Sequence, residues 1–225
     1  MSASTFDRAK ARYRDTGVAE GYDSWRYDTP RGRRRNARDL AAIGRALDEA
    51  VLRGSPVAAA LDLPCGTGRL APLFAERRIA GSGADVAIEM LRVARRKLGP
   101  AFPVFQCSAD AIPLGDRALD AVFAIRFLFH LDGEGRRRVL AEMSRVSRRW
   151  VILDIRHRYN LRWLGWRLRR ALGLLPAMQH RFSRRGLDAE LAEAGLAVRG
   201  IYPSRRYPGG WLSDKWTVLA ERSAP

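Results

Sequence analysis

The chain has 225 residues, of which 47% are hydrophobic and 29% charged, a composition that excludes disorder throughout and fits one large domain or two small ones. Forty-one lysines and arginines against 24 acids give a formal net charge of +17, which favours anionic partners such as nucleic acid, anionic lipid or a phosphorylated substrate. Two cysteines and three histidines, scattered singly, exclude a disulfide scaffold and a zinc-finger cluster, so we expect no bound metal. No apolar run is long enough to span a membrane, and the N-terminal residues lack the apolar core of a secretory signal, so we expect a cytoplasmic location.

Strand and helix patterns alternate along the chain. The strands are short apolar runs that end in glycine, proline or an acid, and the helices between them begin after these turns. Helices are predicted over 36–53, 69–78, 88–98, 133–146 and 187–194, and strands over 57–63, 81–86, 103–107, 121–125, 150–155, 196–202 and 216–220. This alternation predicts a parallel, doubly wound α/β sheet with its ligand site at the carboxyl ends of the strands.

The first predicted strand ends in a glycine turn, Asp62-Leu-Pro-Cys-Gly66-Thr-Gly68. Glycines at this point let the backbone approach a ligand closely, and the helix that follows presents unpaired N–H groups to it. Asp85 ends the second strand, about 20 residues after the turn, which is the spacing of an acid that binds ribose hydroxyls. Together the turn and the acid predict a nucleotide-like cofactor.

Two cofactor classes fit this turn. Gly66-x-Gly68-x-x-Ala71 satisfies the dinucleotide fingerprint, so the motif by itself is compatible with NAD. Asp62, four residues before Gly66, is no part of that fingerprint, and the chain supplies only one nucleotide-binding half. These two features favour a different cofactor.

The motifs, taken in order, resemble those of the class I S-adenosylmethionine-dependent methyltransferases, and especially the small-molecule group of the ubiquinone and menaquinone type. The similarity extends over roughly residues 20–220 and is carried by LDLPCGTGR (61–69), GADVAIEML (83–91), CSADAIPLGDRALDAV (107–122), FLFHL (127–131), SRVSRRWVILD (144–154) and LDAELAEAGLAV (187–198). The resemblance implies a single-domain Rossmann-like sheet, mostly parallel with an antiparallel C-terminal strand, over residues 36–225. Residues 1–35 would be an N-terminal arm or lid, and the cofactor would be S-adenosylmethionine.

The resemblance also implies a role for each cofactor-binding position. Asp62 would face the methionine amino group, Asp85 would hold the ribose, and Val86 or Met90 would line the adenine. The adenine amine would meet Ser108 or Asp110, or the backbone N–H of Ala109. Arg126 departs from the family pattern, which often has a small or polar residue there, and we expect an arginine at this position to bind the cofactor carboxylate or an anionic substrate. Pro64 replaces a glycine of the family pattern and removes an N–H, so we expect the turn to depend on Gly66 and Gly68.

Two histidines are candidate bases. Methyl transfer is an in-line displacement with a neutral leaving group, so the protein must position the nucleophile and needs a base only for a protonated acceptor. His130 and His157 are the candidates. Each also has a structural interpretation: His130 as a buried, hydrogen-bonded residue, and His157 as part of a solvated basic surface.

The expected acceptor side is the basic stretch after the fifth strand. Residues 136–185 hold fifteen arginines and two acids, and the family commonly places an acceptor-recognition insert at about 156–185. A helix predicted over 160–176 carries Trp163 and Trp166 beside arginines. Such a helix suits peripheral contact with an anionic membrane, stacking on RNA, or simple packing as a cover helix.

The resemblance implies a small-molecule or lipid-linked acceptor, and the basic stretch favours an anionic one. An RNA methyltransferase is an alternative that the net charge suggests, although the chain shows no separate RNA-binding module. A non-catalytic, methyltransferase-like partner subunit is a third interpretation. The sequence leaves the oligomeric state open.

Overall fold

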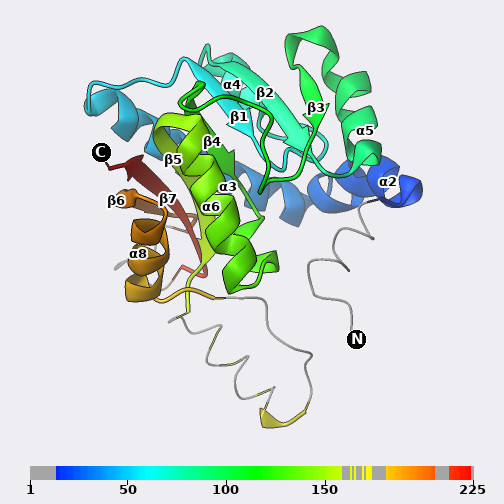
Figure 1. The fold of residues 1–225 in the computed structure, drawn as a ribbon. Coiled ribbons are helices and arrows are strands. Elements are labelled where there is room, and N and C mark those ends of the chain that lie inside the picture. The colour runs from blue at the N-terminus through cyan, green and yellow to red at the C-terminus, as the bar shows by residue number, and fades with distance from the viewer. Residues whose placement is uncertain are drawn as a thin grey trace.

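The protein is built on one seven-stranded sheet (Figure 1). The computed structural model describes residues 14–158, 163, 165, 169, 171–173, 181–205 and 213–223. The strands are β1 (Ala59–Asp62), β2 (Ala80–Asp85), β3 (Val104–Gln106), β4 (Leu119–Ala124), β5 (Ser147–Arg156), β6 (Leu196–Pro203) and β7 (Lys215–Arg222), in the spatial order β3-β2-β1-β4-β5-β7-β6. Only β7 runs antiparallel to its neighbours, β5 and β6. The predicted Rossmann-like sheet with one antiparallel strand near the C-terminus is therefore confirmed.

Helices cover both faces of the sheet (Figure 1). The helices α3 (Pro30–Leu52), α4 (Ala71–Glu76) and α5 (Ile88–Leu98) bury Leu47, Phe74 and Leu91 against one face. On the other face, α6 (Gly133–Val146) and α8 (Arg184–Glu193) bury Met143 and Leu187. The helix α2 (Thr16–Tyr27) packs on α5 and α3, and short 3-10 turns η1 (Gly99–Ala101) and η2 (Leu128–His130) complete the layers. The apolar periodicity of each helix thus reflects burial on one side only.

The helix predicted over 36–53 begins earlier, at Pro30. Thr29 caps it, because its hydroxyl oxygen accepts a hydrogen bond from the Gly32 N–H at 3.0 Å, and Pro30 fits the first turn, where no N–H partner is needed. Residues 30–35 include four arginines and no apolar side chain other than Pro30, so apolar periodicity does not reveal this part of the helix. The boundary expected at residue 36, between an arm and the domain, falls inside α3.

The basic insert expected at 156–185 lies largely outside the described residues. This holds for most of the helix predicted over 160–176 and for Trp166, so a membrane contact through Trp163 and Trp166 stays a prediction. Within the part of the chain that the structure describes, no helix is both long and apolar enough to cross a membrane.

Candidate cofactor site

A cavity opens at the carboxyl ends of β1, β2 and β4, where parallel α/β sheets bind ligands. The sequence-predicted residues that line it are Asp62, Pro64, Gly66, Asp85, Val86, Met90, Arg126 and His130. The other lining residues are Tyr22, Tyr27, Cys65, Thr67, Arg69, Leu70, Ile125 and Phe127. Eight predicted positions, seven from three separate motifs together with Arg126, therefore converge on one cavity.

The glycine turn takes the conformation that its two glycines allow. Gly66 and Gly68 have φ values of +56° and +75°, in the left-handed region that disfavours residues with a side chain. A Cβ on Gly68 would lie 2.2 Å from Leu98 Cδ1, whereas one on Gly66 would meet no atom within 4 Å. The Leu63–Pro64 peptide bond within this turn is cis. Gly68 is therefore needed because the turn packs closely against Leu98. Gly66 borders the cavity, and the space beside it is open.

Asp85 joins this turn to the end of β2. Its carboxylate accepts hydrogen bonds from the Gly66 N–H and the Ala87 N–H, each at 2.9 Å. Burial raises its pKa, although these backbone N–H groups act in the opposite direction. A carboxylate has about four acceptor positions, so two backbone bonds leave others for the expected ribose hydroxyls.

Asp62 at the end of β1 differs from Asp120 near the start of β4 in its hydrogen bonds. Asp120 caps β1, because it accepts hydrogen bonds from the Ala58 and Ala59 N–H groups at 3.0 and 2.9 Å. Asp62 is 2% exposed, yet its carboxylate accepts no hydrogen bond from any residue that the structure describes. Burial raises the pKa of Asp62 to about 8, with a smaller opposing effect from Arg69. Asp62 is thus a buried acceptor that the fold itself does not use.

Arg69 supplies the matching unpaired donor. Its Nη1 donates to Asn36 Oδ1 at 2.7 Å, while its Nη2 is buried with no acceptor among the described residues. The guanidinium also lies 5.8 Å from the ring centre of Tyr27. Arg69 Nη1 also lies 4.0 Å from Asp39 Oδ2, so only the Nη2 end of the guanidinium is available to a ligand. A carboxylate and a guanidinium nitrogen that both lack a hydrogen-bond partner among the described residues fit the ammonium and carboxylate of an α-amino acid, which is the methionine end of S-adenosylmethionine. The sequence prediction had placed only Arg126 in this role, although Arg69 directly follows Gly68.

The N-terminal helix α2 is fastened over the glycine turn. Asp23 accepts a hydrogen bond from the Thr67 hydroxyl at 2.6 Å and forms an ion pair with Lys97 at 2.8 Å. The rings of Tyr22 and Tyr27, 5.9 Å apart edge to face, complete the wall of the cavity on this side. The arm therefore contributes to the site, and its opening and closing as a lid stay a prediction.

Four predicted site residues besides Gly68 do not border the cavity. Ser108 donates a hydrogen bond to Asp110, which also pairs with Arg138 at 3.7 Å, and Ala109 packs in the core beneath α6. The polar side chains of Ser108 and Asp110 are thus engaged with each other and with Arg138 on α6. His157 is 4% exposed, and its ring stacks on Trp216 with the ring centres 3.7 Å apart. The structure makes His157 a packed residue and does not bring it to the candidate site.

His130 and Arg126 form the end of the cavity away from the turn. Burial and the positive charges of Arg126 and Arg156 lower the pKa of His130 to about 4, so its imidazole is neutral at physiological pH. Arg126 has a φ of +64°, an unusual conformation for a residue with a side chain. It is held there because its N–H donates to Asp154 Oδ1 at 2.5 Å and its Nη1 donates to the Tyr27 hydroxyl at 2.7 Å.

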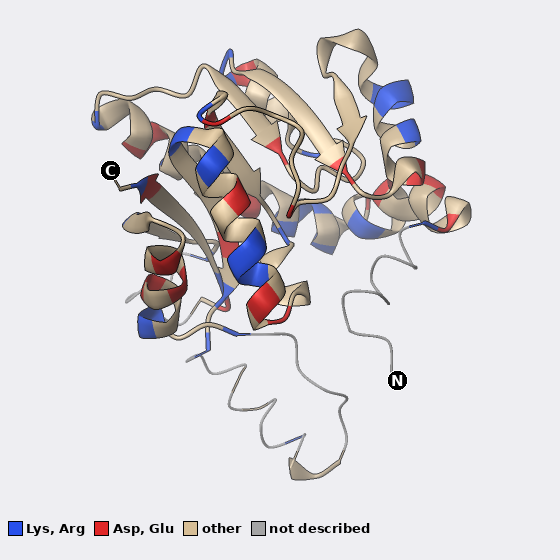
Figure 2. Ribbon diagram, in the orientation of Figure 1, with Lys and Arg blue, Asp and Glu red and all other residues tan. Residues whose placement is uncertain are grey.

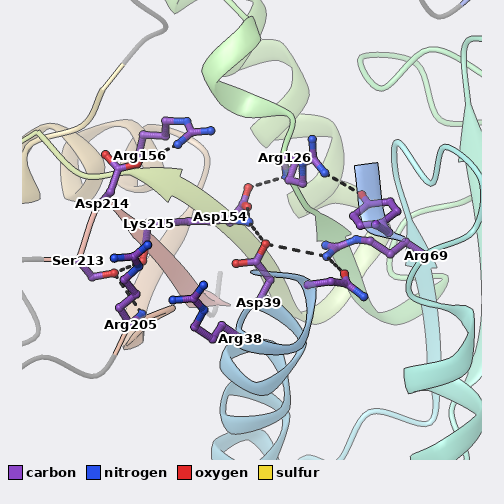
Figure 3. Close-up of polar contacts among 12 residues, drawn as sticks. Arg38, Asp39, Arg69, Arg126, Asp154, Arg156, Arg205, Ser213, Asp214 and Lys215 are labelled. Atoms are coloured by element: carbon purple, nitrogen blue, oxygen red, sulfur yellow. Dashed lines mark hydrogen bonds and ion pairs between the residues drawn. The ribbon is translucent and has the colours of Figure 1, made fainter. Parts of the chain in front are cut away.

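Lys215 holds the elements behind this end together (Figure 3). Its Nζ lies 2.8 Å from Asp39 Oδ2 on α3 and 2.5 Å from Asp154 Oδ2 on β5. Both carboxylates are buried, 5% and 1% exposed. One lysine thus neutralises two buried carboxylates, one of which fixes the backbone of Arg126.

Comparison with known proteins identifies the domain. A family profile described as a methyltransferase domain matches residues 60–149, and no curated protein matches the chain. The magnesium protoporphyrin IX methyltransferase of Synechocystis PCC 6803 with bound S-adenosylhomocysteine has a similar structure, with a TM-score of 0.72 and 16% identity over 96% of this chain and 99% of that one. The same enzyme with bound S-adenosylmethionine gives a TM-score of 0.69 and 14% identity over 99% of each chain.

An S-adenosylmethionine-dependent methyltransferase of Leishmania major shares the fold as well, with a TM-score of 0.66 and 15% identity over 96% of this chain and 82% of that one. These identities are low, so the similarity concerns the fold. The small-molecule subgroup stays a prediction. Residues 60–149 match a methyltransferase domain, and the chain has the fold of the class I S-adenosylmethionine-dependent methyltransferases.

Proposed function

We propose that the protein transfers the methyl group of S-adenosylmethionine to a small-molecule acceptor at the Arg126 and His130 end of the cavity. The observation that carries the proposal is that two residues lining the cavity, Asp62 and Arg69, have a carboxylate and an Nη2 without a hydrogen-bond partner among the described residues. The bound cofactor supplies an electrophilic methyl group on sulfur. In this arrangement Asp62 binds the amino group, Arg69 binds the carboxylate and Asp85 binds the ribose.

His130 defines what kind of nucleophile suits the site. With a pKa of about 4 its imidazole is neutral, so it accepts a hydrogen bond or a proton from the acceptor but is a weak base. Because the leaving group is neutral, catalysis here depends mainly on positioning. The site therefore favours an acceptor atom that is already ionised or that loses its proton easily, such as a carboxylate or an acidic hydroxyl.

The net charge alone does not favour RNA as the acceptor. On α6 and α8 both basic and acidic residues occur (Figure 2), and several arginines are paired with carboxylates. Arg136, for example, binds Glu190 through two hydrogen bonds of 2.7 and 2.9 Å. These arginines are thus paired locally with carboxylates, and the described part of this face of the sheet does not form a continuous unpaired basic surface.

The proposal predicts which pool of molecules accepts the methyl group. The full-length protein is incubated with methyl-labelled S-adenosylmethionine and, separately, with a protein-free small-molecule extract, total RNA or lipid vesicles. We expect label in the small-molecule or lipid pool, and at least tenfold less with an Asp62→Asn variant at S-adenosylmethionine concentrations below the dissociation constant of the wild type. Asp62-dependent labelling of RNA instead, or no labelling of any pool by a protein that binds S-adenosylhomocysteine, would contradict the proposal; the latter result would indicate a non-catalytic partner subunit.

A further inference from the structure

A second cavity, of about 430 Å³, lies beside the cofactor cavity and shares Arg126 with it. Its volume is in the range of small-molecule sites. Seven arginines and one lysine line it against only two aspartates: Arg26, Arg31, Arg35, Arg38, Arg126, Arg156, Arg205 and Lys215 against Asp39 and Asp214. We refer to this second space as the basic cavity. It concentrates positive charge in a concave site next to the place where the methyl group is transferred.

The two aspartates of the basic cavity are already engaged. Asp39 pairs with Lys215 at 2.8 Å, and Asp214 pairs with Arg156 at 2.9 Å (Figure 3). Asp214 also pairs with Arg181 at 2.6 Å. They therefore offer little further charge to the other cations that line the space.

Four arginines of α2 and α3 contribute charge with no carboxylate partner. Arg31, Arg35 and Arg38 follow one face of α3 at i, i+4 and i+7 spacing, and Arg26 lies near them at the end of α2. None of the four forms an ion pair with a described residue. Like charges at this spacing destabilise a helix, so packing alone gives no reason for them.

Buried donors at the same cavity also have no acceptor. The Nε atoms of Arg26 and Arg156 are buried, and no described residue accepts a hydrogen bond from either. Burial, together with the charge of Arg126, lowers the pKa of both Arg26 and Arg35. A bound anion would pair these donors and relieve the mutual repulsion.

We propose that the basic cavity binds the acidic groups of the methyl acceptor, and that the acceptor is a small molecule or headgroup with at least two phosphate or carboxylate groups. Guanidinium groups suit this role because their planar donors match carboxylate and phosphate oxygens in pairs. The number of cations requires more than one acidic group. The assignment of this ligand as the methyl acceptor rests on the proposed function, whereas its anionic chemistry rests on the basic cavity alone.

Arg126 connects the two cavities. Its guanidinium lies 5.9 Å from the ring centre of Tyr27. Nearby, Phe129 lines the basic cavity and its neighbour His130 lines the cofactor cavity. An acceptor held by its acidic groups in the basic cavity would thus extend past Arg126 toward His130. This orientation places its reactive end beside the cofactor.

Titration of the full-length protein with inorganic pyrophosphate tests the basic cavity. We expect binding to the wild type and at least tenfold weaker binding to an Arg35→Gln/Arg38→Gln variant, because the variant loses charge-assisted contacts with the anion. The matched control is Arg92→Gln/Arg137→Gln, which removes the same charge from exposed positions on α5 and α6 that border neither cavity. Pyrophosphate binding to the control should equal that to the wild type.

Two further arms identify the source of the anion and separate this proposal from the proposed function. Vesicles of phosphatidylglycerol that bind the wild type and the control but not the Arg35 and Arg38 variant, in competition with pyrophosphate, would place the acidic groups on a lipid headgroup. Pyrophosphate binding without vesicle binding would place them on a soluble molecule. S-adenosylhomocysteine titration of the same proteins reports on the cofactor site independently. No pyrophosphate binding to the wild type, or equal weakening in both double variants, would overturn the proposal.

Discussion

Asp62→Asn should weaken binding of S-adenosylhomocysteine roughly 10- to 100-fold, because the variant loses a charge-assisted contact with the amino group of the ligand. The same change should stabilise the ligand-free protein at alkaline pH. The pKa of Asp62 rises from its ordinary 3.8 to about 8 on burial, so the folded state retains a proton that the unfolded state has lost. The contribution of Asp62 to stability is therefore complete below pH 4, falls as pH rises and is lost above about pH 8.

Thermal unfolding at several pH values measures this effect. Each pKa unit corresponds to about 1.4 kcal/mol, and 1 kcal/mol shifts the melting temperature of a chain of this length by about 2–4 °C. At pH 8.5 we expect Asp62→Asn to melt about 5 °C or more above the wild type, and at pH 4 to melt at the same temperature. Asp120→Asn is the control with the opposite sign, because backbone N–H bonds and Arg148 lower the pKa of Asp120 despite its partial burial.

Calorimetric titrations in buffers of different ionisation enthalpy add a second readout of Asp62. If binding of the ligand amino group ionises Asp62, one proton is released near pH 7 in the wild type and none in Asp62→Asn. An Asp62→Asn variant that binds S-adenosylhomocysteine as tightly as the wild type would contradict the assigned role.

Lys215→Met should destabilise the protein by about 3–5 kcal/mol, because it leaves two buried carboxylates without their shared cation. Lys215 is itself largely buried, with 15% of its side chain exposed, so solvent does not replace the lost charge. For a chain of this length the melting temperature should fall by about 10 °C. The Asp154 bond to the Arg126 N–H lies in the same network, so S-adenosylhomocysteine binding should weaken as well.

The matched control for Lys215→Met is Lys97→Met. Lys97 also forms an ion pair, with Asp23 at 2.8 Å, but 41% of its side chain is exposed, and exposed pairs contribute less than about 1 kcal/mol. We expect the melting temperature of Lys97→Met to fall by no more than about 4 °C. Equal losses in the two variants would contradict the claim that burial makes the Lys215 network important for stability.

The sheet and half of the cofactor site could be predicted from the sequence because their signals are local. Short apolar runs ending in Asp62 and Asp85 mark strand ends, and parallel topology brings such ends to one edge. The glycine turn between them needs left-handed backbone, which its two glycines supply. These features depend on residue types and their spacing along the chain, and not on contacts between distant segments.

The remaining features depend on contacts between distant segments. Arg69 is one of many arginines, and only its proximity to Asp62 with an unpaired Nη2 distinguishes it. The loop after β3 carries polar residues in a suitable place, but Ser108 and Asp110 bind each other. Likewise, the sequence predicts that the acceptor is recognised by the basic segment after β5. Much of the positive charge that lines the basic cavity comes instead from α2 and α3.

Calorimetric titration of the wild-type protein with S-adenosylhomocysteine, and separately with NAD, tests the central claim most directly. The Asp62 carboxylate and the Arg69 Nη2, which lack hydrogen-bond partners among the described residues, fit the amino acid end of the first ligand, and NAD has no such group. We predict a single site with micromolar affinity for S-adenosylhomocysteine and no heat of binding with NAD. Binding of NAD without binding of S-adenosylhomocysteine would contradict the account and would assign the glycine turn and Asp85 to a dinucleotide.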